Sequence, residues 1–226
     1  MKIGCCGFPV AMEKYFQKFE VVEVQKTFYK PPSIETARKW RENAPKDFEF
    51  TVKAWQVITH PPTSPTYRKV NLKVEDAGFF KPIKPVFEAW EITREIANIL
   101  GAKFVLFQTP KSFKESEENI KNMNQFFHSI ERDFIFGWEA RGWSAGAVKR
   151  VCEELSLVHV VDPFESQPVF GEIKYFRIHK NHTDEEIFSL LRKADYVMFN
   201  NPFMLHDAEK LKKRRDELER EDIKNS

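Results

Sequence analysis

Residues 48–53 read FEFTVK, and the side chains of this segment alternate between apolar and polar. An extended chain places the three apolar residues on one side and Glu49, Thr51 and Lys53 on the other. A period of two residues predicts a β-strand with one apolar and one polar face.

Seven further segments are short and rich in strand-forming residues. They are residues 2–6, 20–25, 103–108, 134–139, 157–161, 174–179 and 195–199. Helical segments separate most of them, so the chain alternates between strand and helix and predicts an α/β fold. Eight strands favour a closed TIM-type (β/α)8 barrel over an open doubly wound sheet. With 226 residues, the barrel is compact and forms a single domain over 1–226.

Polar residues that can cap helices mark where the predicted helices begin. Ser33, Ser116 and Ser144 precede helices that end near Asn43, Ile130 and Leu155, and Thr183 with Glu186 fits a capping box. A helix through Val86 and Leu100 ends at Gly101, and the last helix runs from about Met204 to Glu221. The long Pro-rich loop after the third strand, His60 to Pro82, is typical of a lid or binding loop, and residues 162–171 are too few for a full helix.

The polar face of several strands is unusual, because barrel strands are covered on both sides and usually read as continuous apolar runs. The apolar faces must pack on the helices, so the polar faces must point into the barrel. Many of these polar residues stand near the carboxyl ends of their strands, where TIM-barrel active sites form. We therefore expect a cleft at the C-terminal rim. The alternative is a purely structural network of salt bridges in a narrow barrel.

The cations, amides and aromatic rings of this rim are suited to an anionic ligand. Lys53, Arg141 and Arg177 are the predicted anion-binding residues, since Arg offers paired donors and Lys a point charge. The other predicted substrate-binding residues are Gln108, Asn200, Asn201, Tyr29, His60 and Trp143. For Tyr29 and Trp143, core packing is the competing interpretation, and for His60 it is capping of the loop.

Acid–base work would come from Glu139, Glu23 and His179, which are the predicted catalytic residues. A second hypothesis places a divalent metal on Glu23, Glu139, Asp162 and His179, although no short diagnostic spacing supports it. Cys6 is a weak nucleophile candidate, and a small apolar core residue is the favoured interpretation. His159 alternates with valines and is interpreted as a core histidine.

The overall composition limits the classes of partner. The net charge of +2 implies no general nucleic-acid binding, although a local patch stays open. Three cysteines without a pairing framework favour a reducing compartment, and with no signal peptide or apolar span we expect a cytoplasmic protein that does not enter a membrane. The sequence contains neither a GxGxxG nor a GxxxxGK[ST] motif, so no motif in it indicates a nucleotide cofactor. The sequence defines neither a cofactor nor an oligomeric state.

Seven segments, in order, resemble the YecE-like family (domain of unknown function 72). They are residues 4–8 (GCCGF), 19–29 (FEVVEVQKTFY), 48–60 (FEFTVKAWQVITH), 107–113 (FQTPKSF), 139–143 (EARGW), 175–179 (YFRIH) and 196–201 (YVMFNN). Lys180 departs from the family pattern, where a Gly usually follows the His. The resemblance implies a TIM barrel and no established reaction.

Three hypotheses of function follow. The first is an enzyme that acts on an anionic, phosphate-bearing substrate at the rim. The second is a metal-dependent phosphodiesterase or nuclease-like hydrolase. The third is a non-catalytic module that binds a small anion.

Overall fold

The computed structural model describes residues 1–224 and contains one eight-stranded parallel sheet. The strands are β1 (Lys2–Cys6), β2 (Val21–Val24), β3 (Glu49–Lys53), β4 (Phe104–Gln108), β5 (Ile135–Glu139), β6 (Val158–His159), β7 (Tyr175–Ile178) and β8 (Tyr196–Phe199). Each predicted strand segment contains one of them. Neighbours in the sheet run in the order β6-β5-β4-β3-β2-β1-β8-β7, so only β6 and β7 are left to close the ring.

The barrel closes between β6 and β7 through a single bridge, Val161 to Phe176. The backbone N–H of Arg177 donates to the carbonyl of Val161 at 2.8 Å, and that of Val161 donates to Tyr175 at 3.4 Å. Every other neighbouring pair has two or more residues in register. The expected TIM-type barrel is thus confirmed, with a thin seam at one position.

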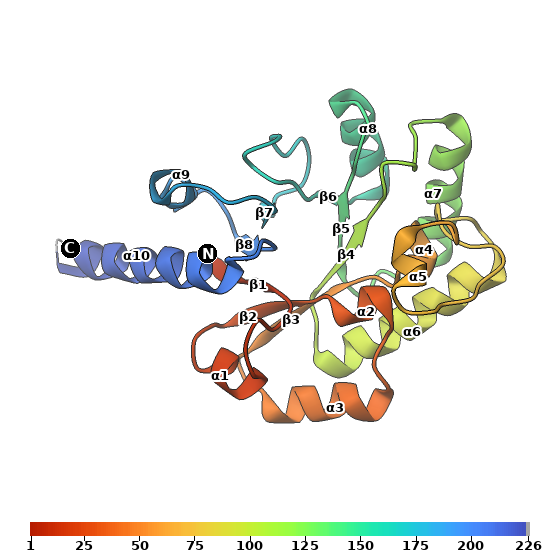
Figure 1. Ribbon diagram of the computed structural model, residues 1–226. Coiled ribbons are helices and arrows are strands. Elements are labelled where there is room, and N and C mark those ends of the chain that lie inside the picture. The colour runs from red at the N-terminus through yellow and green to blue at the C-terminus, as the bar shows by residue number, and fades with distance from the viewer. Residues whose placement is uncertain (225–226) are drawn as a thin grey trace.

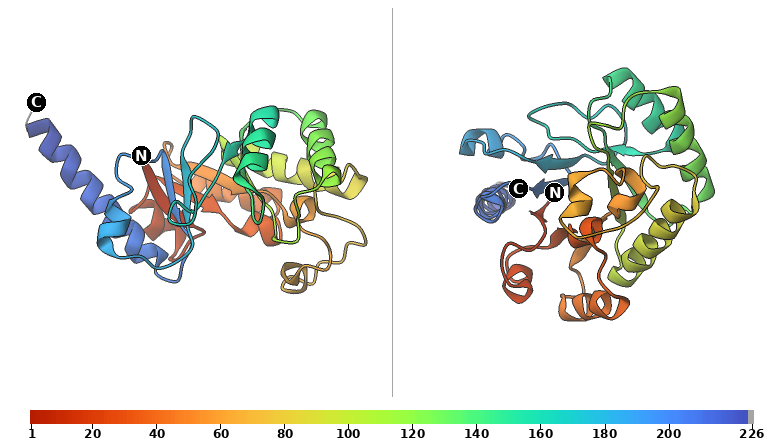
Figure 2. Two further views of the ribbon diagram at one scale, coloured as in Figure 1. Left: turned by 90° about the horizontal axis from the view of Figure 1, so that it is seen from above. Right: turned by 45° about the vertical axis from the view of Figure 1, so that its right-hand side comes forward.

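Helices surround the strands, as the right-hand view of Figure 2 shows. They are α1 (Met12–Phe16), α2 (Lys26–Tyr29), α3 (Ile34–Asn43), α4 (Gln56–Thr59), α5 (Pro65–Arg68), α6 (Lys84–Leu100), α7 (Glu117–Ser129), α8 (Ala145–Leu155), α9 (Asp184–Phe188) and α10 (Met204–Lys224) (Figure 1). The predicted caps of α3, α7 and α8 all accept a backbone N–H, and Thr183 forms the capping box of α9. Residues 160–174 form no helix, and the loop from His60 to Pro82 contains the one-turn helix α5.

Two apolar layers hold the barrel together. The outer layer lies between strands and helices, where Trp90, Phe107, Phe126 and Phe136 pack edge to face. The inner layer fills the lower part of the barrel with Val21, Phe104, Leu106, Val158, Val160, Tyr175 and Met198. Above this layer the side chains of Glu23, Glu139 and Arg177 lie toward the carboxyl ends of the strands, whereas Glu49 at the amino end of β3 pairs with Lys2.

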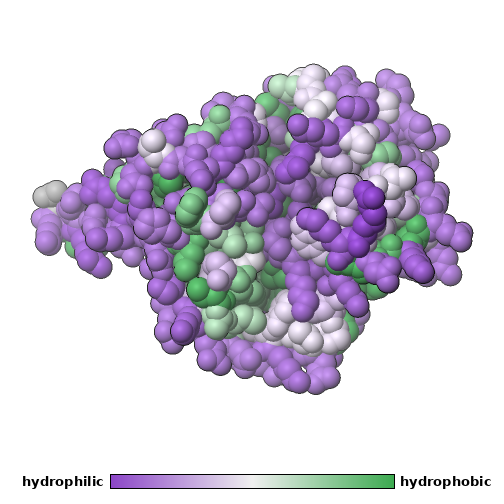
Figure 3. All heavy atoms as spheres, in the orientation of Figure 1, coloured by the Kyte–Doolittle hydropathy of each residue, from purple (hydrophilic) through white to green (hydrophobic). Residues whose placement is uncertain are grey.

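The last helix is only partly attached to the barrel. Asp207, Ala208 and Leu211 near the start of α10 are buried, and the rest of the helix projects beyond the barrel (Figure 2, left). The projecting part is hydrophilic, like most of the molecular face in Figure 3. Within residues 1–224, every helix is too short or too polar to cross a lipid bilayer.

Candidate functional site

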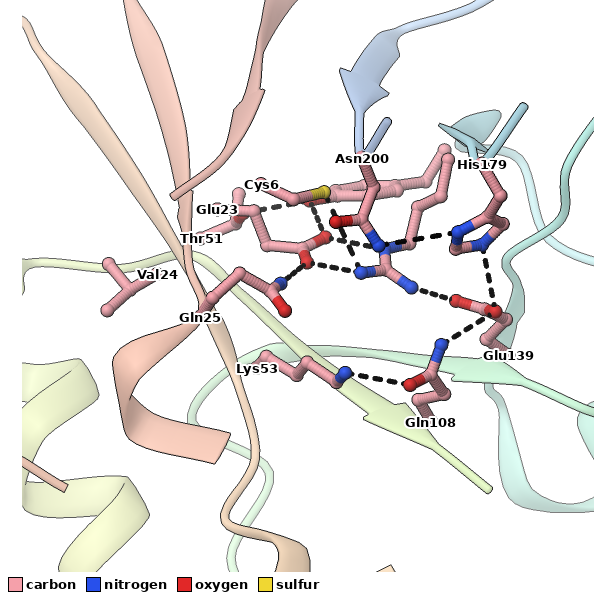
Figure 4. Close-up of polar contacts among 12 residues, drawn as sticks. Cys6, Glu23, Val24, Gln25, Thr51, Lys53, Gln108, Glu139, His179 and Asn200 are labelled. Carbon is pink, nitrogen blue, oxygen red and sulfur yellow. Dashed lines mark hydrogen bonds and ion pairs between the residues drawn. The ribbon is translucent and has the colours of Figure 1, made fainter. Parts of the chain in front are cut away.

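A buried ion network joins β2, β5 and β7 at the carboxyl end of the barrel (Figure 4). The Arg177 side chain is 0% exposed, and its Nε and Nη2 donate to the Oε2 and Oε1 atoms of Glu23 at 3.0 and 2.9 Å. Its Nη1 pairs with Oε2 of Glu139. Burial alone would lower the pKa of Arg177, but the two carboxylates raise it well above its usual range. The guanidinium therefore stays charged and links both carboxylates.

The rest of the Glu23 carboxylate is also occupied. The hydroxyl of Tyr175 donates to Oε2 at 2.9 Å, and the amide of Gln25 donates to Oε1. The Cys6 sulfur lies 3.6 Å from Nη2 of Arg177, and burial together with the charge of Glu23 raises the thiol pKa well above its usual value. Cys6 is thus a neutral thiol in the barrel interior, which agrees with the interpretation as a core residue.

Glu139 is surrounded by hydrogen-bond donors. Its Oε1 accepts from the Gln108 amide at 2.8 Å and from Nη2 of Arg141 at 3.0 Å. Burial would raise the pKa of Glu139, but Arg177, His179 and Arg141 outweigh it and hold the pKa well below its usual value. An ionised carboxylate with so low a pKa is a poor proton acceptor and is suited to orienting the groups around it.

His179 directly follows β7 and faces Glu139. Its Nε2 lies 3.2 Å from Oε1 of Glu139, and its Nδ1 lies 3.3 Å from the side-chain nitrogen of Asn200. An amide nitrogen can only donate, so Nδ1 accepts in this contact and Nε2 carries the proton directed at Glu139. The backbone N–H of His179 donates to Asp162 at 2.9 Å. Nδ1 is therefore the ring nitrogen that carries the lone pair, and in this structure the lone pair accepts from Asn200.

Lys53 ends β3 and points into the same region (Figure 4). Its Nζ donates to Oε1 of Gln108 at 2.7 Å and lies 3.8 Å from the ring centre of Phe28. Burial and the charge of Arg177 lower its pKa to about 7. Gln108 thus connects Lys53 to Glu139 through its two amide atoms.

A cavity of about 460 Å³ lies at the carboxyl ends of β5, β6 and β7. Its lining contains five residues that the sequence analysis singled out for a site, namely Glu139, Arg141, Trp143, Asp162 and His179. The Arg141 side chain is 39% exposed, so its charge is accessible. Trp143 is held by a hydrogen bond from Nε1 to the Phe113 carbonyl at 2.7 Å and stacks on the Phe113 ring.

Several predicted site residues lie outside this lining. Glu23, Lys53, Gln108 and Arg177 are buried beside or beneath it, so Arg177 is placed to orient Glu139 rather than to contact a ligand in the cavity. Asn200 is half-buried and covers His179.

Three others have separate surroundings. Both amide atoms of Asn201 hold the start of α10, because Oδ1 accepts from Phe203 and Nδ2 donates to Asp207. Tyr29 lines a different cavity. His60 packs on the ring of Phe28, and burial with nearby Lys53 lowers its pKa to about 3, so the ring is neutral.

Three residues that the sequence did not predict, Lys111, Glu165 and Ser166, also line the cavity. Lys111 could have been found, since it lies in the loop directly after β4 and therefore at the rim. Glu165 and Ser166 lie in the irregular segment between β6 and β7, where no periodicity predicts orientation. His159 lines the cavity although Nδ1 accepts from the Val169 backbone at 3.2 Å, and burial lowers its pKa to about 4.

The four residues of the metal hypothesis do not form one ligand set. Glu23 and Glu139 are separated by the guanidinium of Arg177, and Asp162 accepts from the backbone of Phe164 and His179. Within residues 1–224, no three His, Cys, Asp or Glu side chains are arranged to hold a metal ion.

The model of the family described as "Protein of unknown function DUF72" matches residues 9–222. A DUF72 family protein from Enterococcus faecalis V583 is 17% identical with a TM-score of 0.68 and covers 95% of this chain and 97% of its own. One from Thermotoga maritima MSB8 is 20% identical with a TM-score of 0.64 and covers 95% and 98%.

A D-tagatose 3-epimerase-like protein is 17% identical with a TM-score of 0.59 and covers 100% of both chains. At these identities the likeness establishes the fold alone. None of the curated proteins matches the chain.

Proposed function

The chain belongs to the DUF72 family of proteins of unknown function. Since the family leaves the activity open, we propose one from the cavity at the ends of β5, β6 and β7. We propose that the protein is an enzyme that acts there on an anionic, phosphate-bearing substrate. The observation that carries the proposal is the position of Arg141. Its guanidinium lines the cavity, is partly exposed, and is fixed from behind by Glu139. A guanidinium that is already oriented binds an oxyanion at a low entropic cost.

A second cation lines the same cavity. Lys111 lines the cavity and is exposed, so a phosphate between Lys111 and Arg141 would meet a point charge and a planar donor group. Trp143 also lines the cavity, and the part of its indole ring that Phe113 leaves uncovered would contact the carbon skeleton of the same ligand.

His179 is the proposed acid–base group. Glu139 fixes the ring and holds the proton on Nε2, which leaves Nδ1 to exchange a proton with the substrate once Asn200 moves aside. In this scheme Glu139 is a positioning residue, and Arg177 with Glu23 holds it in place.

The proposal is tested by titrating inorganic phosphate by calorimetry and by assaying turnover on a panel of phosphoesters and sugar phosphates. Arg141→Gln should weaken phosphate binding by about ten- to a hundredfold, which corresponds to a lost charge-assisted hydrogen bond. Arg150→Gln, an equal change of charge at an exposed site on α8, should leave binding unchanged. His179→Asn should abolish turnover and retain phosphate binding.

Each alternative function has its own outcome. Equal phosphate affinity in wild type and Arg141→Gln would contradict the proposal. Tight binding without turnover on the whole panel would support a non-catalytic anion-binding module. Turnover that is lost with a chelator and restored by Mn²⁺ or Zn²⁺ would support the metal-dependent hydrolase.

A further inference from the structure

Lys53 is a buried amine without a carboxylate of its own. The residue is 4% exposed, and both carboxylates of the region, Glu23 and Glu139, are engaged by Arg177. Among the residues that the structure describes, the one hydrogen-bond acceptor recorded for Nζ is the amide oxygen of Gln108. Buried lysines are normally paired with an acid, so burial without one favours the uncharged amine, whereas the Phe28 ring 3.8 Å from Nζ favours the charged form.

The charges around Lys53 act in both directions. Arg177 on β7 repels a proton on Nζ, and this repulsion adds to the effect of burial. Glu139 on β5, Glu23 on β2 and Cys6 on β1 oppose it. His60 at the end of α4 is uncharged at neutral pH. With a pKa of about 7, the amine is about half unprotonated at pH 7, whereas an exposed lysine is unprotonated in roughly one molecule in 2,500.

The position of Lys53 connects this amine to the cavity. Lys53 is the last residue of β3 and lies inside the barrel. The Gln108 amide accepts from Nζ of Lys53 and donates to Oε1 of Glu139, and Glu139 lines the cavity. Figure 4 shows Lys53 and Gln108 directed toward one another. Gln108 thus lies between Nζ and the cavity-lining Glu139, and its displacement would open Nζ toward the cavity.

We propose that Lys53 is a nucleophilic lysine that forms a Schiff base with the aldehyde or ketone group of the substrate. The inference rests on the proposed function for the anionic part of the substrate and adds a carbonyl group to it. A compound that carries both, such as a small phosphorylated aldehyde, would place its phosphate at Arg141 and Lys111 and would displace Gln108 from Nζ.

The reaction needs no oxidant or reductant. The nitrogen lone pair attacks the carbonyl carbon, a C–N bond forms, and the carbonyl oxygen takes up a proton to give a carbinolamine. The C–O bond then breaks, and the hydroxyl group leaves as water with one further proton. Nitrogen loses one of its two protons in the sequence and ends as a protonated imine.

The experiment traps the imine. The full-length protein is incubated at pH 7 with glycolaldehyde phosphate and reduced with sodium borohydride, and the modified residue is located by peptide mass spectrometry. One adduct at Lys53 is expected. Lys53→Met, which keeps a similar volume, should lose this adduct, and Lys149→Met, at an exposed position on α8, should retain it. Because the adduct is mapped in the wild-type protein, the test stands even if Lys53→Met fails to fold.

The outcomes separate this inference from the proposed function. If the protein binds phosphate through Arg141 but forms no adduct at Lys53, the Schiff base is overturned and the proposed anion site is retained. An adduct at Lys53 that forms equally well with unphosphorylated glycolaldehyde, in a protein that does not bind phosphate, would overturn the proposed anion site and support the lysine. Adducts spread over exposed lysines at the same level would overturn the special reactivity of Lys53.

Discussion

Nε2 of His179 lies 3.2 Å from Oε1 of Glu139, and this contact joins the end of β7 to the end of β5 across the two-residue strand β6. A histidine backed by an ionised carboxylate keeps one tautomer and one orientation, so the carboxylate contributes to proton transfer without exchanging a proton itself.

Replacing Glu139 by Gln should therefore separate turnover from binding. Turnover should fall by about 10²–10⁴, the usual contribution of a positioned acid–base group. Phosphate affinity should change little, because the amide oxygen of the variant can still accept from Arg141 while a negative charge is removed from the cavity. Steady-state kinetics and phosphate calorimetry measure the two effects. Glu165→Gln removes a carboxylate from the same lining and should leave turnover within a few-fold; unchanged turnover in Glu139→Gln would contradict the assigned role.

Replacing Arg177 by Met should destabilise the protein by about 3–5 kcal/mol, because two buried carboxylates lose their partner. Adding Glu23→Gln and Glu139→Gln to the same protein should recover part of this loss. Urea unfolding at pH 7 gives the free energies. Lys39→Met, which breaks an exposed pair with Glu35, serves as the control and should change stability little. A loss in Arg177→Met no larger than in the control would show that the network contributes little to folding.

Acid should weaken the fold through His60 and His159. Their folded-state pKa values of about 3 and 4 lie below the unfolded value of about 6.5, so between these limits the unfolded chain binds more protons. Stability should therefore fall as the pH drops from 6.5 toward 4, by at most about 3 kcal/mol for His159. His159→Asn keeps an acceptor for Val169 and should reduce this loss, whereas His128→Asn, at an exposed histidine, should not. Equal pH profiles for the two variants would contradict the prediction.

Raising the pH above 7 should stabilise the folded protein through Lys53. Its folded pKa of about 7 lies below the unfolded value of about 10.4, so the folded state holds fewer protons between these values and stability should rise with pH across this window. The rise should be absent in Lys53→Met and present in Lys149→Met. Chemical denaturation at pH 7, 8 and 9 measures it, and a wild-type curve parallel to that of Lys53→Met would rule it out.

Gly137 should not tolerate a side chain. A Cβ at this position on β5 would lie 2.4 Å from Phe104 and 2.8 Å from Val160. The Phe104 ring stacks on Tyr175, which donates to Glu23, so a displaced ring would also disturb the network. Gly137→Ala should cost about 1–3 kcal/mol in thermal or urea unfolding. Gly146→Ala on α8, where a Cβ meets nothing within 4 Å, should be neutral or slightly stabilising, and similar effects of the two variants would disprove the steric argument.

The sequence predicted the barrel well because its signals are local. Alternation in residues 48–53 and capping at Ser33 and Thr183 depend on neighbours a few residues away, and the structure confirms each of them. The inward direction of Glu23, Lys53 and Arg177 also followed from the period of two. Strand β6 is shorter than the predicted segment 157–161, because its ladder to β5 ends at His159 and only Val161 is bridged to β7.

Contacts that depend on the shape of the loops were less predictable. No sequence period shows that Asn201 holds the start of α10 while Asn200 reaches His179. Similarly, nothing in the residue types indicates that Arg177 is covered and Arg141 exposed, although both are arginines near the ends of strands. The difference arises because Arg177 lies within β7, whereas Arg141 lies two residues beyond β5.

The thin seam between β6 and β7 has a dynamic consequence. Because only one backbone bridge joins β6 to β7, the ion pair of Glu139 and Arg177 helps to close the barrel at this position by linking β5 to β7. An ion pair between side chains can break and re-form while the hydrogen bonds between the other seven pairs of neighbouring strands stay intact. Local opening of the barrel should therefore begin between β6 and β7, beside the cavity. Among the amides that join neighbouring strands, those of Val161 and Arg177 should exchange their hydrogens with solvent first.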